Sequence, residues 1–247
     1  MATVEINDGD GVRVIRWNRP EALNAFNDEV WDITRDALRS AQADPELRCV
    51  VVTGTGRAFT AGQDLGEMAA PPEHDDGELH GYRGFIPVLE GFDKPLLAAV
   101  NGLALGIGAT VLPYCDIVWI AEDARLKVPF VTLGVTTEAA GSLLLPQRMG
   151  WQAASHFIFT AEWMSAHDAV ACGLAWKVCP AGALLDDVMA VARQIGEMPV
   201  DSVQTTKRLM VAARADAVRA AREREDTEFV RMVGNQTNQA ALTQFLT

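Results

Sequence analysis

Short apolar runs recur along the first half of the chain and predict strands. Residues 12–17 alternate apolar and polar side chains, which is typical of a strand with one buried face. Residues 49–54, 95–102 and 115–121 are nearly continuous apolar runs, the pattern of strands buried on both faces. Amphipathic segments separate these runs, so we predict an α/β fold built from repeated strand–helix units.

Helical spacing of apolar residues predicts the segments between the strands. Residues 27–43 have this spacing, with Asn27 as the N-cap of the helix. We expect further helices over 106–112 and 162–174, and an almost wholly helical chain from Asp201 onward.

The domain organisation follows from this pattern. We expect a core over residues 1–195 and a C-terminal helical region over 196–247, of a kind often used to cover a neighbouring subunit. The polar, turn-rich segment 67–81 is expected to be a surface loop.

Composition and charge narrow the possible partners. Of the 247 residues, 49% are hydrophobic and 22% are charged, as in ordinary soluble globular proteins. The net charge of -12 opposes binding to nucleic acid and to anionic membrane surfaces, so we expect neither as a partner. A phosphorylated ligand would need a local cluster of Lys, Arg or backbone N–H groups.

Other features of the sequence favour a cytoplasmic protein without a metal. The four cysteines form no C-x-x-C pair, and the four histidines have no metal-ligand spacing. We recognise no signal peptide and no apolar stretch long enough to span a bilayer. We therefore expect a cytoplasmic protein with reduced thiols, no metal and no membrane segment.

Two glycine-rich turns follow predicted strands and open helices, at residues 58–65 and 101–110. Glycine lets a backbone approach a ligand closely, and a helix N-terminus presents unpaired N–H groups. Two such turns facing each other could clamp a developing oxyanion. The simpler alternative is a pair of close-packed strand–helix junctions without a ligand. Neither turn has the pattern of a dinucleotide site or a P-loop.

Together with residues 18–25 and 165–174, these turns resemble the crotonase family, also called the enoyl-CoA hydratase/isomerase superfamily. The resemblance runs from about Val4 to the last helices, in the family's order and at similar spacing. It implies a spiral of β-β-α repeats with a C-terminal helical trimerisation region, and a homotrimer or a dimer of trimers. It also implies an acyl-CoA thioester substrate, with coenzyme A bound as part of that substrate and no separate cofactor.

The resemblance assigns site residues by motif position. The thioester carbonyl would accept hydrogen bonds from the backbone N–H groups of Gln63 and Ile107, which form the oxyanion hole. Coenzyme A is expected along five residues of the same motifs: Arg19, Leu23, Ala61, Asp64 and Leu65. Lys207, on the predicted C-terminal helix, is a candidate contact for the coenzyme A phosphates, and a simple surface charge is the alternative.

Both acids that hydratases of this family use are replaced. Thr110 and Phe130 stand where the two glutamates belong. Neither side chain can transfer the required proton, so we expect both as walls of the acyl pocket that keep water out.

One carboxylate remains nearby, that of Glu138, which we expect to open the next helix. Residues 129–138, together with Gly106 and Ile107, resemble the Δ3,Δ2-enoyl-CoA isomerase branch, in which the matching glutamate is the catalytic base. A single carboxyl of raised pKa among apolar walls can take a proton from C2 and return it at C4. The alternative is an acid that only favours the helix dipole.

Other functions stay open on the sequence alone. They are an enoyl-CoA hydratase or another crotonase reaction with atypical acids, and a non-catalytic acyl-CoA-binding or assembly subunit. The acyl group accepted depends on how residues 67–92 fold over the pocket, where His80 or Tyr82 could touch the acyl chain.

Overall fold

The computed structural model describes residues 2–69, 72, 74–75 and 77–246. Its larger sheet consists of β1 (Val4–Gly9), β2 (Val12–Trp17), β3 (Cys49–Gly54), β5 (Leu96–Val100), β7 (Ile117–Ala121) and β10 (Lys177–Cys179). The strands lie in the order β1-β2-β3-β5-β7-β10. β1 pairs antiparallel with β2, and the other neighbours pair in parallel.

The smaller sheet consists of β4 (Ala58–Thr60), β6 (Leu103–Leu105), β8 (Arg125–Lys127) and β9 (Met164–Ser165). The strands lie in the order β4-β6-β8-β9, with the first three parallel and β9 antiparallel to β8.

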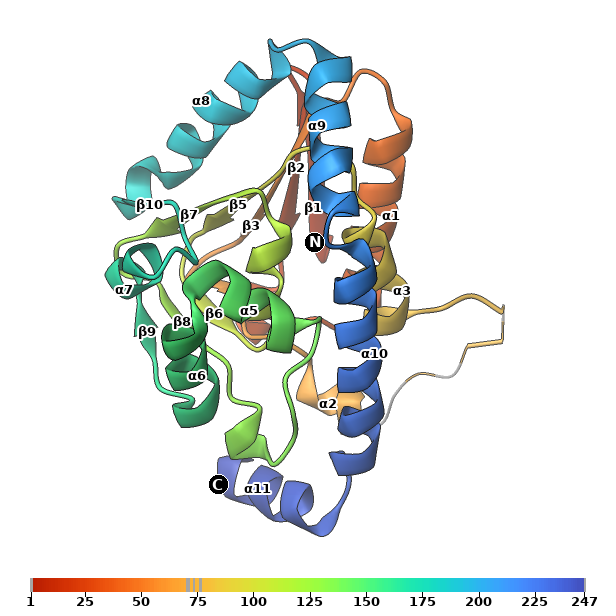
Figure 1. Ribbon diagram of the computed structural model, residues 1–247, viewed down its shortest axis with the longest axis vertical. Coiled ribbons are helices and arrows are strands. Elements are labelled where there is room, and N and C mark those ends of the chain that lie inside the picture. Colours follow the sequence, from red (N-terminus) through yellow and green to blue (C-terminus); the bar gives the residue numbers. More distant parts are fainter. Residues whose placement is uncertain (1, 70–71, 73, 76, 247) are drawn as a thin grey trace.

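Helices separate and cover the two sheets (Figure 1). The α-helices are α1 (Asp28–Ala43), α2 (Leu65–Ala69), α3 (Gly81–Glu90), α4 (Ile107–Thr110), α5 (Gly141–Met149), α6 (Trp151–Thr160), α7 (Ala166–Ala171), α8 (Leu184–Gly196), α9 (Val200–Ala212), α10 (Ala215–Met232) and α11 (Gln236–Leu246). The short 3-10 helices are η1 (Pro20–Ala22), η2 (Leu112–Tyr114), η3 (Val131–Leu133) and η4 (Ala181–Ala183).

The chain alternates between the sheets in a spiral. It passes from the larger to the smaller sheet from β3 to β4, from β5 to β6 and from β7 to β8, and a helical segment follows each pair. The predicted α/β fold of β-β-α repeats is therefore confirmed. After α8, which ends at Gly196, the described chain is helical.

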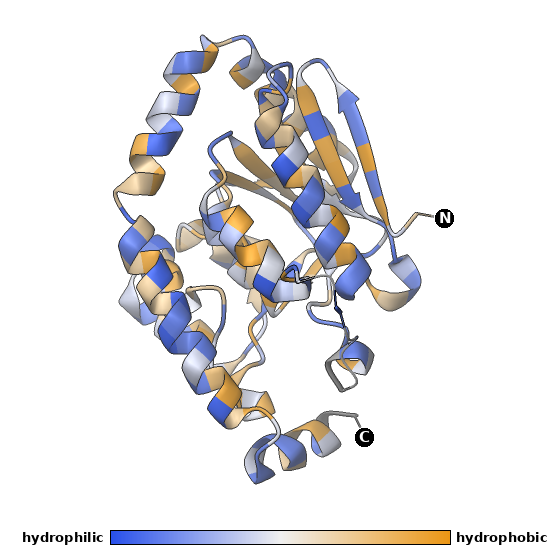
Figure 2. Cartoon of the chain, turned by 90° about the vertical axis from the view of Figure 1, so that its right-hand side faces the viewer, coloured by the Kyte–Doolittle hydropathy of each residue, from blue (hydrophilic) through white to orange (hydrophobic). Residues whose placement is uncertain are grey.

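The strand and first-helix predictions agree with the structure. The strands β2 and β3 have the predicted bounds, and the Asn27 side chain accepts a hydrogen bond of 3.1 Å from the Val30 N–H, which makes it the N-cap of α1. Figure 2 shows hydrophilic and hydrophobic residues alternating along the outer strands β1 and β2, as expected where one face meets solvent.

Two helical predictions were too long, and one predicted loop begins inside a helix. The helix expected over 106–112 stops at Thr110 and continues as η2, because Pro113 lacks the N–H that an α-helix needs. In the segment 162–174, the strand β9 precedes a helix of six residues. The loop expected over 67–81 begins inside α2, and residues 70, 71, 73 and 76 lie outside the described residues.

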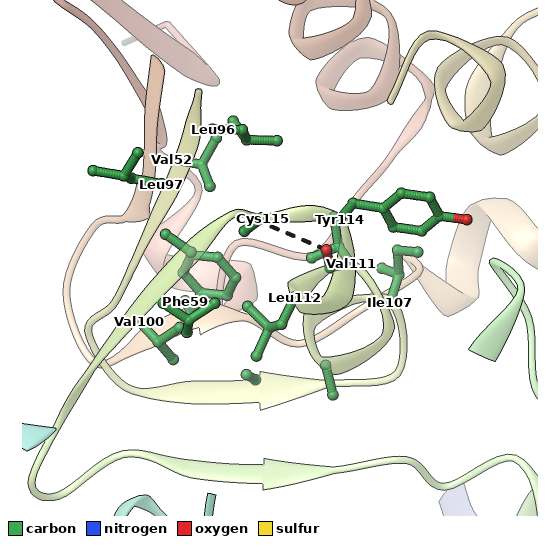
Figure 3. Close-up of a cluster of buried hydrophobic side chains, with 14 of the residues drawn as sticks. Val52, Phe59, Leu96, Leu97, Val100, Ile107, Val111, Leu112, Tyr114 and Cys115 are labelled. Atoms are coloured by element: carbon green, nitrogen blue, oxygen red, sulfur yellow. Dashed lines mark hydrogen bonds between the residues drawn. The ribbon is translucent and has the colours of Figure 1, made fainter. Parts of the chain in front are cut away.

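Aromatic side chains form the part of the core beneath the first glycine-rich turn. The ring of Trp17 meets those of Phe26 and Phe59 edge-on at centroid distances of 4.7 Å, and Phe26 meets Trp31 at 4.5 Å. Figure 3 shows Phe59 and Ile107 in the adjoining apolar cluster. The Ile107 side chain is 2% exposed, so this residue anchors the start of α4 in the core.

Side-chain hydrogen bonds attach the C-terminal helices to the core. The Lys207 ammonium of α9 donates to both carboxylate oxygens of Asp116, at 2.6 and 2.7 Å. The Asn238 side chain of α11 donates to the Leu133 carbonyl at 2.7 Å. Among the described residues, no helix combines the length and apolar character needed to cross a membrane.

Candidate active site

Three parallel strands end at one edge of the smaller sheet. The register pairs Ala58 with Leu103 and Leu105 with Lys127, so the carboxyl ends of β4, β6 and β8 point the same way. The segments that follow these strands contain Gln63, Ile107 and Phe130. Residues predicted from separate motifs are thereby brought to one edge, where α/β sheets commonly bind ligands.

Glycine allows the two predicted turns to approach each other closely. Gly62 has φ of +90°, and a Cβ atom there would lie 2.9 Å from the Leu105 carbonyl oxygen and 3.8 Å from Gly106 Cα. A Cβ atom at Gly108 would lie 2.7 Å from a methyl carbon of Thr60. The 61–63 turn and the start of α4 are therefore in direct contact.

The backbone around Gln63 leaves its N–H group unpaired. Phe26 donates its N–H to the Gly62 carbonyl at 2.7 Å, and Asp64 donates its N–H to the Phe26 carbonyl at 2.9 Å. These two bonds flank Gln63, whose own N–H has no acceptor within the part of the chain that the structure describes. Its side-chain oxygen accepts a hydrogen bond of 2.9 Å from the Trp31 indole, which fixes the turn.

The Ile107 N–H is also unpaired. Ile107 is the first residue of α4, and the first N–H groups of a helix have no intrahelical partner. Gly106 before it donates to the Lys127 carbonyl at 2.9 Å, and Thr110 after it donates to the Gly106 carbonyl at 3.0 Å. No acceptor for the Ile107 N–H is found among the described residues. Two free donors from touching turns form a candidate oxyanion hole.

The residues expected along coenzyme A gather beside the Gln63 turn. The Arg19 guanidinium donates to Asp64 at 3.1 Å and to the Ala25 carbonyl at 2.7 Å. The Leu23 carbonyl accepts the Ala61 N–H at 2.9 Å. Asp64 also accepts the Gly66 N–H at 3.0 Å, at the start of α2 and its first residue Leu65.

Lys207 lies apart from this group of residues and has a partner inside the protein. Its side chain is 7% exposed, and its ammonium donates to both oxygens of Asp116, which also accepts the Leu96 N–H at 2.8 Å. This placement differs from the exposed surface charge that the sequence left open, and it makes Lys207 a link between α9 and the larger sheet.

Glu138 lies in a loop and does not open a helix, contrary to our expectation. The helix α5 begins at Gly141, and Ala139 and Ala140 before it have φ of +58° and +54°. Left-handed backbone is uncommon for residues other than glycine and is often retained at functional sites. The loop therefore holds the two residues that follow Glu138 in an uncommon backbone conformation.

Two tyrosines hold the Ala139 peptide group from both sides. The Tyr82 hydroxyl accepts the Ala139 N–H at 2.8 Å, and the Tyr114 hydroxyl donates to the Ala139 carbonyl at 2.9 Å. The sequence had indicated Tyr82 only as a possible acyl contact and had not indicated Tyr114. Both act here on the backbone next to Glu138.

Thr110 and Phe130 are buried, at 0% and 6% exposure, as pocket walls would be. Thr110 lies one helical turn after Ile107, and its methyl carbon is 3.4 Å from where a Cβ atom at Gly141 would lie. This contact joins the end of α4 to the segment that contains Glu138. No titratable side chain stands at either position.

The surroundings of Glu138 disfavour its ionised form. The residue is half-buried, and burial raises the pKa of its carboxyl to about 8, with the negative charges of Glu225 and Asp226 adding to the effect. Glu225 lies on α10 and was missed from the sequence, because nothing local distinguishes it from the charged residues around it. A carboxyl with a pKa near neutrality can both accept and return a proton.

Within the described residues, no group of three His, Cys, Asp or Glu side chains could hold a metal ion. The arrangement instead combines two free backbone donors with one carboxyl of raised pKa. Backbone donors of this kind can stabilise an enolate oxyanion, and a carboxyl of raised pKa can move a proton on a neighbouring carbon.

Comparison with known proteins identifies the family of this chain. The family model described as enoyl-CoA hydratase/isomerase matches residues 7–247, and the chain belongs to this family. It is therefore an enzyme that processes acyl-CoA thioesters.

Two curated relatives from Escherichia coli K12 illustrate the range of the family. A 1,2-epoxyphenylacetyl-CoA isomerase is 32% identical over 84% of this chain and 81% of its own length. A 2,3-dehydroadipyl-CoA hydratase is 30% identical over 100% of this chain and 96% of its own length.

Solved structures confirm the fold. An enoyl-CoA hydratase/isomerase from Pseudoalteromonas atlantica superimposes with a TM-score of 0.94 at 30% identity, covering 99% of this chain and 96% of its own. An enoyl-CoA hydratase from Mycobacterium marinum gives a TM-score of 0.80 at 44% identity, covering 85% of this chain and 99% of its own.

Proposed function

We propose that this enzyme is a Δ3,Δ2-enoyl-CoA isomerase in which Glu138 is the single acid and base. The observation that supports this most directly is the raised pKa of the Glu138 carboxyl, in the segment that contacts the end of α4 at Thr110, with Thr110 and Phe130 in place of the hydratase acids. Hydration needs groups that activate water and protonate carbon, whereas isomerisation needs one group that moves one proton.

The proposed reaction begins with the thioester oxygen bound by the N–H groups of Gln63 and Ile107. The Glu138 carboxylate takes a proton from C2 of a 3-enoyl-CoA, and the electron pair of the C–H bond delocalises as a dienolate onto the thioester oxygen. The protonated Glu138 then delivers the same proton to C4, and the double bond moves to C2–C3. The two amides stabilise the dienolate most, because its charge lies on the oxygen that they bind.

The rest of the substrate has a proposed place as well. Coenzyme A would lie along Arg19, Leu23, Ala61, Asp64 and Leu65, with no other cofactor. Thr110 and Phe130 would line the acyl pocket and exclude water. The contacts that gather these residues beside the Gln63 turn support this assignment.

We also propose that the chain assembles as a homotrimer, or as a dimer of trimers. Trp151, Phe159 and Trp176 leave 73%, 69% and 70% of their surface exposed in the single chain. Apolar side chains of this size are usually covered, and a second copy would cover them.

The test compares wild type with Glu138→Gln on 3-enoyl-CoA and 2-enoyl-CoA. Wild type should convert 3-enoyl-CoA to the conjugated thioester, seen as a rise in its ultraviolet absorbance. Glu138→Gln should be slower by about 100- to 10,000-fold, the usual contribution of a general acid or base. Glu122→Gln, an exposed turn residue, is the matched control and should keep the wild-type rate.

An enoyl-CoA hydratase is the second candidate, because hydratases are among the relatives aligned over nearly their whole length. It predicts water addition to 2-enoyl-CoA, seen as a loss of conjugated absorbance with wild type. Equal isomerisation rates from wild type and Glu138→Gln would rule out the role proposed for Glu138.

A further inference from the structure

Glu225 links the C-terminal helices to the loop that contains Glu138. It lies on α10, which packs against α5 and passes beside its start in Figure 1. Glu225 is 5% exposed, and its Oε1 atom accepts the Ser142 N–H at 2.7 Å. Ser142 is the second residue of α5, so Glu225 fixes the helix end that follows Glu138.

The second carboxyl oxygen of Glu225 has an unusual environment. Its Oε2 atom is buried and accepts no hydrogen bond from any residue that the structure describes. A buried acceptor left without a partner costs about 1–3 kcal/mol. Capping of α5 alone would need only a neutral side-chain oxygen, which Ser or Asn supplies without this cost. Burial raises the pKa of the Glu225 carboxyl, while interactions with the Ser142 side chain and with the backbone N–H groups of Ser142 and Ala140 favour its ionised form.

Few charges are available to balance Glu225. The titratable groups that interact with it are Asp226 on its own helix, Tyr82 on α3, Tyr114 on η2 and Glu138 in the loop, and Arg222, Arg214 and Glu90 also act on Tyr114. Arg222 donates to Glu90 at 2.8 Å and to Asp226 at 3.2 Å, so its positive charge is already matched. The negative charge of Glu225 therefore acts on Glu138 without a cation reserved to cancel it.

We propose that Glu225 is a positioning residue for Glu138, which it serves in two ways. Its hydrogen bond to Ser142 fixes the start of α5 and the 138–140 loop, and its carboxyl group places a negative charge next to that loop when it is ionised. This inference rests on the proposed role of Glu138 as acid and base.

The electrostatic effect has a definite sign. A negative neighbour opposes ionisation of a carboxyl, so Glu225 is one cause of the raised pKa of Glu138, after burial. Removing that charge lowers the pKa of Glu138. The base then stays ionised to lower pH, and the acidic limb of the kcat/KM profile moves in the same direction.

Two substitutions separate the two roles. Glu225→Gln keeps an oxygen for the Ser142 N–H and removes the charge, whereas Glu225→Ala removes both. Glu228→Gln is the matched control, since Glu228 lies on the same helix, is about half exposed and pairs with Arg231. The first readout is the pH profile of kcat/KM with 3-enoyl-CoA. The second is the infrared titration of the Glu138 carboxyl, obtained by subtracting the spectrum of the same protein with the additional substitution Glu138→Gln.

Glu225→Gln should shift both the profile and the Glu138 titration to lower pH, by on the order of one unit. Glu225→Ala should in addition lower kcat at every pH by about tenfold or more, and Glu228→Gln should match wild type. An unchanged Glu138 titration in Glu225→Gln would overturn the inference. If wild type does not isomerise 3-enoyl-CoA but the infrared shift is present, the proposed function fails while the electrostatic coupling stands.

Discussion

Glu138, the proposed acid and base, has surroundings that are unfavourable for the fold. Its carboxyl is half-buried near the negative charges of Glu225 and Asp226, and the next two residues adopt left-handed backbone without being glycine. Each of these features costs free energy of folding. The two tyrosine hydrogen bonds to the Ala139 peptide group offset part of that cost and keep the loop in place.

A stability experiment measures this cost. Because the pKa of Glu138 is raised to about 8 in the folded protein, folding favours its protonated form, and stability is lost as pH rises from the unfolded pKa to about 8. Glu138→Gln removes this loss. We expect the variant to be more stable than wild type by up to about 5 kcal/mol at pH 9, since the pKa rises from 4.5 to about 8 and one pKa unit corresponds to about 1.4 kcal/mol.

The difference should nearly vanish at pH 4, where Glu138 is protonated in both states. Urea denaturation of wild type and Glu138→Gln at pH 4, 7 and 9 provides the measurement. A stability difference that stays constant over this range would mean that the carboxyl is not desolvated in the folded protein.

At the scale of elements, the site depends on three strand ends of the smaller sheet. The parallel register of β4, β6 and β8 places the segments that follow them side by side. Gly62 and Gly108 then allow the first two of these segments to touch. The proposed oxyanion hole thus depends on the sheet register and on two glycines, and it requires no side-chain functional group.

Replacing Gly62 tests this arrangement. A Cβ atom at Gly62 would lie 2.9 Å from the Leu105 carbonyl oxygen, and the φ of +90° is unfavourable for alanine. Gly62→Ala should therefore separate the two turns and lower kcat by about 100- to 1,000-fold, the cost of losing one oxyanion donor. Gly182→Ala, where a Cβ atom meets nothing within 4 Å, should keep wild-type kinetics. Wild-type kcat in Gly62→Ala would show that these turns bind no oxyanion.

The sequence predicted the parts of this site that are encoded locally. Each glycine-rich turn lies directly after an apolar strand, so the positions of Gln63 and Ile107 could be inferred from a few neighbouring residues. Glu138 could be singled out because the expected acids at Thr110 and Phe130 are absent, although its loop was mistaken for a helix start.

Contacts between distant residues could not be predicted. Tyr82 and Tyr114 reach Ala139 from 57 and 25 residues away, and Glu225 reaches Ser142 from 83 residues away. Lys207 pairs with Asp116 across 91 residues. No pattern in the adjoining sequence marks these side chains as partners, because the contacts exist only after the helices dock.

At the scale of the whole molecule, the C-terminal helices are tied to both the core and the site. Lys207 attaches α9 to Asp116, and Glu225 attaches α10 to α5. The exposed aromatic side chains of α6, Trp151 and Phe159, are a separate feature, since nothing in the single chain covers them. The proposed interface between copies would cover this surface, on a chain whose net charge of -12 favours solubility.

The proposed assembly predicts a native mass three or six times that of the chain, which is 26.7 kDa. Light scattering after size-exclusion chromatography measures it. Trp151→Glu with Phe159→Glu should lower the mass to that of smaller species, because charges would be buried at the interface. Leu79→Glu, at a side chain 62% exposed in the polar loop, is the control and should leave the mass unchanged. A monomeric wild type would contradict the proposal.

Ile107 combines a side chain packed in the core with an unpaired backbone N–H that the proposed reaction uses, and this has a consequence for how the enzyme can evolve. Any residue except proline retains that N–H donor, so substitutions at position 107 change the packing of the core and leave the donor in place. Glu138 has no such protection, since a single substitution removes the only carboxyl that the proposed reaction uses. Proteins that evolve from this chain can therefore lose proton transfer while they keep the proposed backbone donors for the thioester oxygen. New reactions can then arise at that binding site.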